Sequence, residues 1–80
     1  MKPVQESIRK RISEILRQPL EKVSDERVLT ELVAESFLLV EMVIELQEDF
    51  GVRLHQDDLN EVRTVGDLIG LIVRRAAEAD

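Results

Sequence analysis

Residues 35–51, ESFLLVEMVIELQEDFG, decide the fold of this chain. Their apolar residues recur at the spacing of a helix, so the stretch predicts a helix from Ser36 to Phe50. Ser36 is a favourable N-cap residue, and Gly51 supplies the usual C-terminal stop. These two helix ends are the best defined in the sequence.

The predicted helix has two apolar faces, because each residue advances it by about 100°. One stripe, expected to face the core, consists of Leu39, Met42, Val43, Leu46 and Phe50. A second apolar strip in a different sector consists of Phe37, Val40 and Ile44, and Glu41, Glu45 and Glu48 lie beside it. Apolar residues edged by carboxylates predict a surface that docks on positively charged partners. The alternative is that Phe37, Val40 and Ile44 pack under a neighbouring loop or a short third helix.

Three further helices are expected around this one. Val4 to Arg17 forms an amphipathic helix stopped by Pro19, and Gln56 to Glu61 forms a short third helix. The last helix starts at Thr64, where Asp67 stands three residues after a threonine N-cap in a capping-box arrangement. Residues 18–35 lack sustained periodicity and predict a long ordered loop that packs across the core. The sequence therefore predicts an all-α, four-helix bundle with three main helices, a long first loop and no sheet.

Length, charge and composition narrow the function. Eighty residues suffice for one compact domain, here the single domain 1–80. The net charge is −6, and residues 28–52 hold six acids and no base, so nucleic acid is not an expected partner. Cysteine is absent, and the longest uninterrupted apolar run is four residues. We expect a cytoplasmic monomer without a membrane segment.

Four segments of the chain resemble the phosphopantetheine-dependent acyl carrier proteins, a family of free-standing carriers. The family has Asp-Ser-Leu at the start of its second helix, then Val-Glu, an acid-rich run ending in Glu-Phe-Gly, and a later Thr-Val-Gly-Asp. The corresponding segments here are Glu35-Ser36-Phe37, Val40-Glu41, Leu46-Gln47-Glu48-Asp49-Phe50-Gly51-Val52 and Thr64-Val65-Gly66-Asp67. Their joint occurrence at family spacing is far more specific than the serine motif alone.

The resemblance implies that Ser36 accepts a 4'-phosphopantetheine group from coenzyme A, transferred by a separate phosphopantetheinyl transferase. The arm then carries acyl intermediates as thioesters to fatty-acid or polyketide-type enzymes. The residues themselves agree, because the single histidine, His55, lies in another segment and no nucleophile–base pair can be assembled around Ser36. The sequence also contains no metal-ligand cluster and no glycine-rich phosphate loop, so we expect a carrier and not an enzyme.

The resemblance also assigns a partner-binding face. Glu41 matches the family position whose carboxylate contacts basic residues of partner enzymes. The full predicted face comprises Glu35, Phe37, Val40, Glu41, Ile44, Glu45 and Glu48. For each single carboxylate, an ordinary solvated surface remains the alternative.

Three departures from the family pattern surround Ser36. Glu35 replaces aspartate, Phe37 replaces leucine, and Leu38 stands at a usually polar position. These changes suggest a dedicated carrier in a specialised acyl pathway. The alternatives are an unmodified scaffold subunit with a carrier-like fold, and an aminoacyl carrier; the peptidyl type usually has a Gly-Gly-x-Ser element, which this chain lacks.

Overall fold

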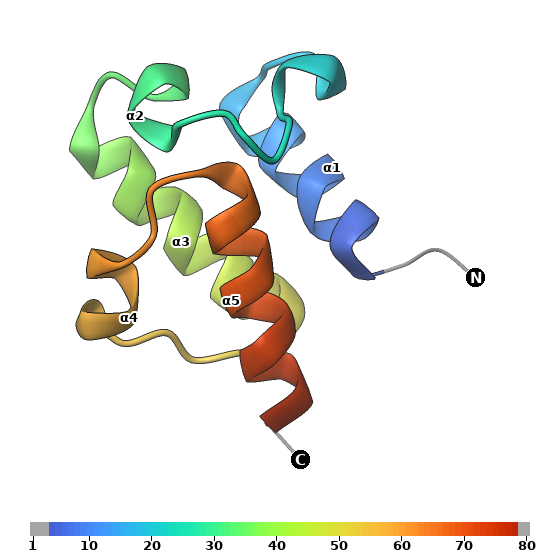
Figure 1. Cartoon of the computed structure of the whole chain (residues 1–80), viewed down its shortest axis with the longest axis vertical. Coiled ribbons are helices and arrows are strands. Elements are labelled where there is room, and N and C mark those ends of the chain that lie inside the picture. Colours follow the sequence, from blue (N-terminus) through green and yellow to red (C-terminus); the bar gives the residue numbers. More distant parts are fainter. Residues whose placement is uncertain (1–3, 79–80) are drawn as a thin grey trace.

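A computed structural model describes residues 4–78 and shows a small bundle of helices (Figure 1). Three long helices, α1 (Val4–Leu16), α3 (Ser36–Phe50) and α5 (Val65–Glu78), form its body. Shorter elements connect them: the 3-10 turn η1 (Leu20–Lys22), α2 (Leu29–Leu32) and α4 (Gln56–Asn60). Within the described residues there is no strand, only an isolated bridge between Val28 and Thr64. The predicted all-α fold is confirmed.

The core lies where the three long helices face one another. Each helix contributes fully buried side chains to one apolar cluster, among them Ile8 and Ile12 of α1, Met42 and Leu46 of α3, and Leu68 and Ile72 of α5. Leu39 and Phe50 are half-buried against the same cluster. The inner stripe predicted for α3 is therefore the stripe that packs into the core.

The ends of the long helices follow from local backbone chemistry. Gly51 closes α3 in the left-handed region at φ 63°, and both its N–H and that of Val52 donate to the carbonyl of Gln47. Asp67 accepts hydrogen bonds from the N–H groups of Arg63 and Thr64, while its own N–H donates to the Thr64 hydroxyl at 3.1 Å. The predicted capping box of the last helix is confirmed.

Two predicted helix ends and one predicted N-cap need correction. The short third helix, α4, ends at Asn60 and not at Glu61. The first helix ends at Leu16, because Arg17 adopts a left-handed backbone with φ 56° before Pro19. Ser36 is the first helical residue of α3 and not its N-cap; Glu35 holds the extended N-cap conformation, with φ −106° and ψ 124°. The Ser36 hydroxyl makes no hydrogen bond to any residue between 4 and 78, so it does not cap the backbone N–H groups of the first turn of α3.

The long first connection packs across the core as expected, but it contains the two short elements η1 and α2. Val23, Leu29 and Val33 of this connection are buried. Its middle is fastened to the start of α5, because the N–H of Val65 donates to the carbonyl of Arg27 at 2.9 Å. A Cβ at Gly66 would lie 3.1 Å from Asp25, so glycine permits this close approach.

Candidate functional site

Ser36 begins α3 at the surface of the bundle. It is exposed, and it follows the extended Glu35, so its side chain stands at the N-terminal end of a helix of 15 residues. The positive end of a helix dipole favours a phosphodiester placed there. An exposed hydroxyl with no hydrogen-bond partner in the described part of the chain fits attachment of a phosphopantetheine group by another protein. Among the described residues, no cluster of acidic or histidine side chains is arranged to hold a metal ion.

The outer strip of α3 is open to solvent. Phe37 is 56%, Val40 58% and Ile44 48% exposed, although apolar side chains of this size are usually buried. These values argue against the alternative in which all three residues pack under a loop or a short helix, although Val40 and Ile44 border a groove that they share with α4. Leu38 is also exposed, so the surroundings of Ser36 are apolar on more than one side.

The carboxylates of the predicted face do not all have the same environment. Glu35, Glu41, Glu45 and Glu48 are all exposed. Arg11 of α1 reaches across to α3, where its guanidinium is 3.6 Å from Glu45 and donates a hydrogen bond to Asp49. That hydrogen bond to Asp49 raises the pKa of Arg11. Glu45 is therefore partly neutralised within the molecule, whereas no ion pair joins Glu41 or Glu48 to residues 4–78.

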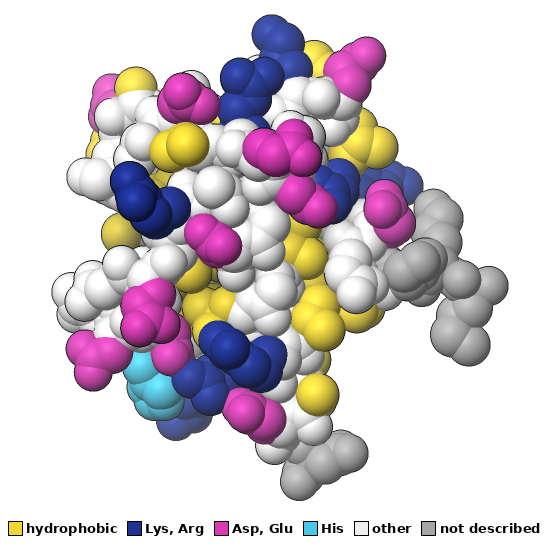
Figure 2. Space-filling view, in the orientation of Figure 1, with side chains coloured by type: hydrophobic (Ala, Val, Ile, Leu, Met, Phe, Trp, Pro, Cys, Tyr) yellow, Lys and Arg dark blue, Asp and Glu magenta, His cyan; other side chains and the backbone are white. Residues whose placement is uncertain are grey.

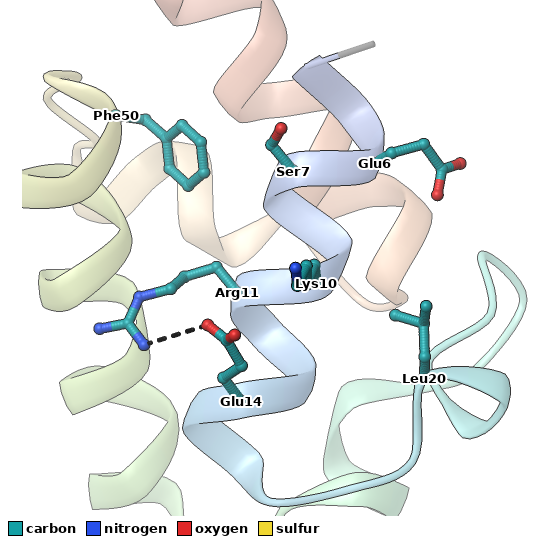
Figure 3. A pocket seen from close by; sticks show the side chains of 7 residues that line it. All are labelled: Glu6, Ser7, Lys10, Arg11, Glu14, Leu20 and Phe50. Carbon is teal, nitrogen blue, oxygen red and sulfur yellow. Dashed lines mark ion pairs between the residues drawn. The ribbon is translucent and has the colours of Figure 1, made fainter. Parts of the chain in front are cut away.

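A hollow beside this contact lies away from Ser36. Figure 3 shows it between α1, the end of α3 and η1, with Phe50 on one side, Leu20 on the other and the Arg11–Glu14 ion pair between them. Its volume is about 490 Å³. None of the predicted site residues lines it, so it is separate from the site at the start of α3.

A more apolar groove, the α3/α4 groove, runs along α3 on the side of α4. Its volume is about 580 Å³, which is within the range of small-molecule sites. Its apolar lining consists of Leu29, Leu39, Val40, Val43, Ile44, Leu54, Leu59, Val62 and Leu68. Leu39, Val40 and Val43 stand three, four and seven residues after Ser36, which places them on the same side of the helix as the serine. Ser36 therefore stands at one end of this row of lining residues.

Only the α3 side of this groove was predictable from the sequence. Val40 and Ile44 were predicted as a partner surface, and the structure shows that they also border the groove. Leu54, Leu59 and Val62 form the opposite side together with polar groups of Gln56 and Asn60. Their scattered apolar pattern was the only sequence signal, and it does not distinguish a groove wall from core.

None of the helices in the described part of the chain has the length and apolar character needed to cross a membrane.

Comparison with known proteins agrees with this geometry. A family model described as a phosphopantetheine attachment site matches residues 6–72. The chain is 33% identical over 69 residues to an acyl carrier protein of Acidothermus cellulolyticus, covering 85% of this chain and 82% of that protein. It is 34% identical over 65 residues to an acyl carrier protein of Thermotoga maritima, covering 80% of each.

A solved structure supports the same assignment. The crystal structure of an acyl carrier protein from Thermotoga maritima superimposes with a TM-score of 0.76 and 25% identity, covering 96% of this chain and 91% of that one. The chain therefore belongs to the acyl carrier protein family, whose members carry a covalent phosphopantetheine group.

Proposed function

We propose that Ser36 is the attachment point of the 4'-phosphopantetheine arm, and that this chain presents acyl thioesters on the arm to separate enzymes. One observation carries the assignment: Ser36 is an exposed serine at the start of a long helix, within the matched region 6–72, and its hydroxyl has no hydrogen-bond partner among residues 4–78. When attached, the arm supplies the thiol that the chain lacks, because the chain contains no cysteine.

Attachment requires chemistry that this chain does not provide. Transfer from coenzyme A forms a bond between the Ser36 Oγ and the phosphorus, and the nucleotide part of coenzyme A leaves. The serine proton must pass to a base, but no hydrogen bond joins the Ser36 hydroxyl to a basic side chain within residues 4–78. The single histidine, His55, lies in another segment, at the start of α4. Activation of the hydroxyl therefore belongs to a phosphopantetheinyl transferase, and the role of this chain is carriage and not catalysis.

A covalent arm changes how substrates reach the processing enzymes. Once the carrier has docked, delivery of the acyl group is effectively intramolecular, so its local concentration depends on tether length and not on bulk concentration. We propose that docking uses Phe37, Val40 and Ile44 together with Glu35, Glu41 and Glu48, against basic patches of acyl-processing enzymes. Their exposure and the surplus of negative charge on α3 support this. Glu45 contributes less, because Arg11 lies beside it.

We also propose that the acyl chain enters the α3/α4 groove. The groove is largely apolar, and its lining residues follow Ser36 along one side of α3. Burial of an apolar chain there removes it from water and is favourable by about 25 cal/mol per Å². A cytoplasmic location, a monomeric state and a specialised pathway remain predictions.

The experiment that tests the attachment site is intact mass spectrometry. Purified protein is incubated with coenzyme A, magnesium and a broad-specificity phosphopantetheinyl transferase. We expect the parent to gain the mass of one phosphopantetheine group, and Ser36→Ala to gain none. Ser24→Ala, at another exposed serine, is the matched control and should load like the parent. Loading of Ser36→Ala would contradict the site, and failure of the parent with several transferases would favour the scaffold function.

A further inference from the structure

Helix α4 is the least firmly packed wall of the α3/α4 groove. None of its five residues is fully buried, and only Leu59 packs half-buried against the core cluster. The opposite wall, α3, is held by Met42 and Leu46, both with no exposed surface. If the groove widens, the movement must come mainly from α4, because moving α3 would disrupt the core.

An ion pair fastens α4 to the last helix. The Asp58 Oδ1 accepts a hydrogen bond from Arg75 Nη2 at 2.6 Å, and the two side chains are only 17% and 30% exposed. Glu78 binds Arg75 Nη1 at 2.8 Å and holds the guanidinium from the other side. Figure 2 shows acidic side chains in the α4 region beside cationic side chains of α5 at the lower left of the molecule. This is the ion pair that joins α4 to α5 within residues 4–78.

The remaining contacts of Asp58 strengthen its position. Its other oxygen accepts the backbone N–H of His55 at 3.2 Å, which caps the start of α4. The hydrogen bond from Arg75, followed by that from His55, lowers the pKa of Asp58, and the bond to Asp58 raises the pKa of Arg75. Both groups are therefore charged at neutral pH. A side chain that caps α4 and also binds α5 couples the position of the whole short helix to α5.

We propose that the Asp58–Arg75 ion pair holds α4 against α5 and thereby limits the length of the acyl chain that the α3/α4 groove accepts. The proposal rests on the proposed entry of the acyl chain into this groove. A short chain fills the groove without displacing Leu59, whereas a longer chain pushes α4 outward and must break or stretch the ion pair. The two residues are positioning residues for the cargo, and neither lines the groove itself.

The first test measures local opening of α4 without any cargo. Hydrogen–deuterium exchange is followed at residues 56–60 in the unmodified protein. Arg75→Gln should raise their exchange rates about two- to fivefold, the range expected for a partly exposed ion pair. Arg74→Gln is the matched control, because it removes the same charge from an adjacent exposed residue outside this ion pair. Arg75→Lys, which keeps a cation, should restore part of the protection. Equal exchange in Arg75→Gln and Arg74→Gln would overturn the proposal.

The second test measures chain-length selection in the loaded protein. Hexanoyl and tetradecanoyl thioesters are prepared on each variant, and their cleavage by hydroxylamine is compared with that of the same thioester on free pantetheine. For each variant, the protection of the tetradecanoyl thioester is divided by that of the hexanoyl thioester. A uniform loosening of the bundle lowers both values alike and leaves this ratio unchanged. This ratio should rise about two- to fivefold in Arg75→Gln, stay unchanged in Arg74→Gln and return toward the parent in Arg75→Lys. An unchanged ratio in Arg75→Gln, or no protection of either chain, would refute chain-length selection.

Failure of the carrier function is recognised separately. Intact mass is measured before the thioesters are tested, so a chain that does not load at Ser36 refutes the proposed attachment and not the ion pair. In that case the hydrogen–deuterium exchange rates of α4 alone decide whether the Asp58–Arg75 ion pair holds this helix. Equal rates in Arg75→Gln and Arg74→Gln would still overturn that role of the ion pair.

Discussion

Leu46→Ala and Ile44→Ala test the division of α3 into an inner and an outer face. The two side chains are equal in size and two residues apart, but Leu46 has no exposed surface and Ile44 is 48% exposed. Deleting a fully buried leucine removes its transfer free energy and leaves a cavity, which costs about 3 kcal/mol. A domain of 80 residues has a free energy of unfolding of about 4–12 kcal/mol. Leu46→Ala should therefore remove a quarter or more of the total stability.

Ile44→Ala should behave differently. The side chain is already half in water, and alanine has the higher helix propensity, so the free energy of unfolding should change by less than about 1 kcal/mol. Both variants are measured by urea denaturation with circular dichroism as the probe, and the slopes are compared to check two-state behaviour. If Ile44→Ala lost as much stability as Leu46→Ala, the outer strip would be part of the core, and the two-face interpretation of α3 would be refuted.

Two further predictions concern charge. Glu41→Gln and Glu48→Gln should each raise the KM of the carrier for loading by a transferase about two- to fivefold at low salt, and this difference should shrink as added salt screens the charges. The control is Glu21→Gln in η1, which removes the same charge at another exposed position. An equal rise in KM for Glu21→Gln would indicate an effect of net charge and not a docking face. Hydrogen bonds from the N–H groups of Arg63 and Thr64 lower the pKa of Asp67, so its contribution to stability is present above the ordinary pKa of 3.8 and is lost as the pH falls through the lowered value. Asp67→Asn should therefore flatten the acid limb of the stability profile, and an unchanged limb would contradict this assignment.

The long helices were predictable because their signals are local. In α3 the apolar stripe repeats at helical spacing and Gly51 adopts the left-handed conformation that ends the helix, so both predicted ends, Ser36 and Phe50, are confirmed. The capping box of α5 is equally local, because Thr64 and Asp67 are only three residues apart. The N-cap of α3 was assigned one residue too late, since residue type alone does not distinguish an extended Glu35 from a helical Ser36.

The two short elements of the first connection were not predictable in the same way. The helix α2 has only four residues and η1 three, too few for a periodic pattern. The connection that contains them is held by distant partners: Val28 pairs with Thr64, and Arg9 of α1 donates to the carbonyl of Val23 at 2.7 Å. Such contacts join residues far apart in the sequence, so no short window of the chain contains their cause.

By itself, the sequence determined the three long helices, the inner and outer faces of α3, the acidic middle of the chain and the serine that resembles a carrier attachment site. Each of these depends on residue types at short, fixed spacing. Only the tertiary structure decided which side of α3 borders a groove, that Arg11 neutralises part of the carboxylate row, and that Asp58 meets Arg75 across 17 positions. The physical reason is that helix periodicity orients side chains around one axis, whereas the packing of the whole core determines which axes lie side by side.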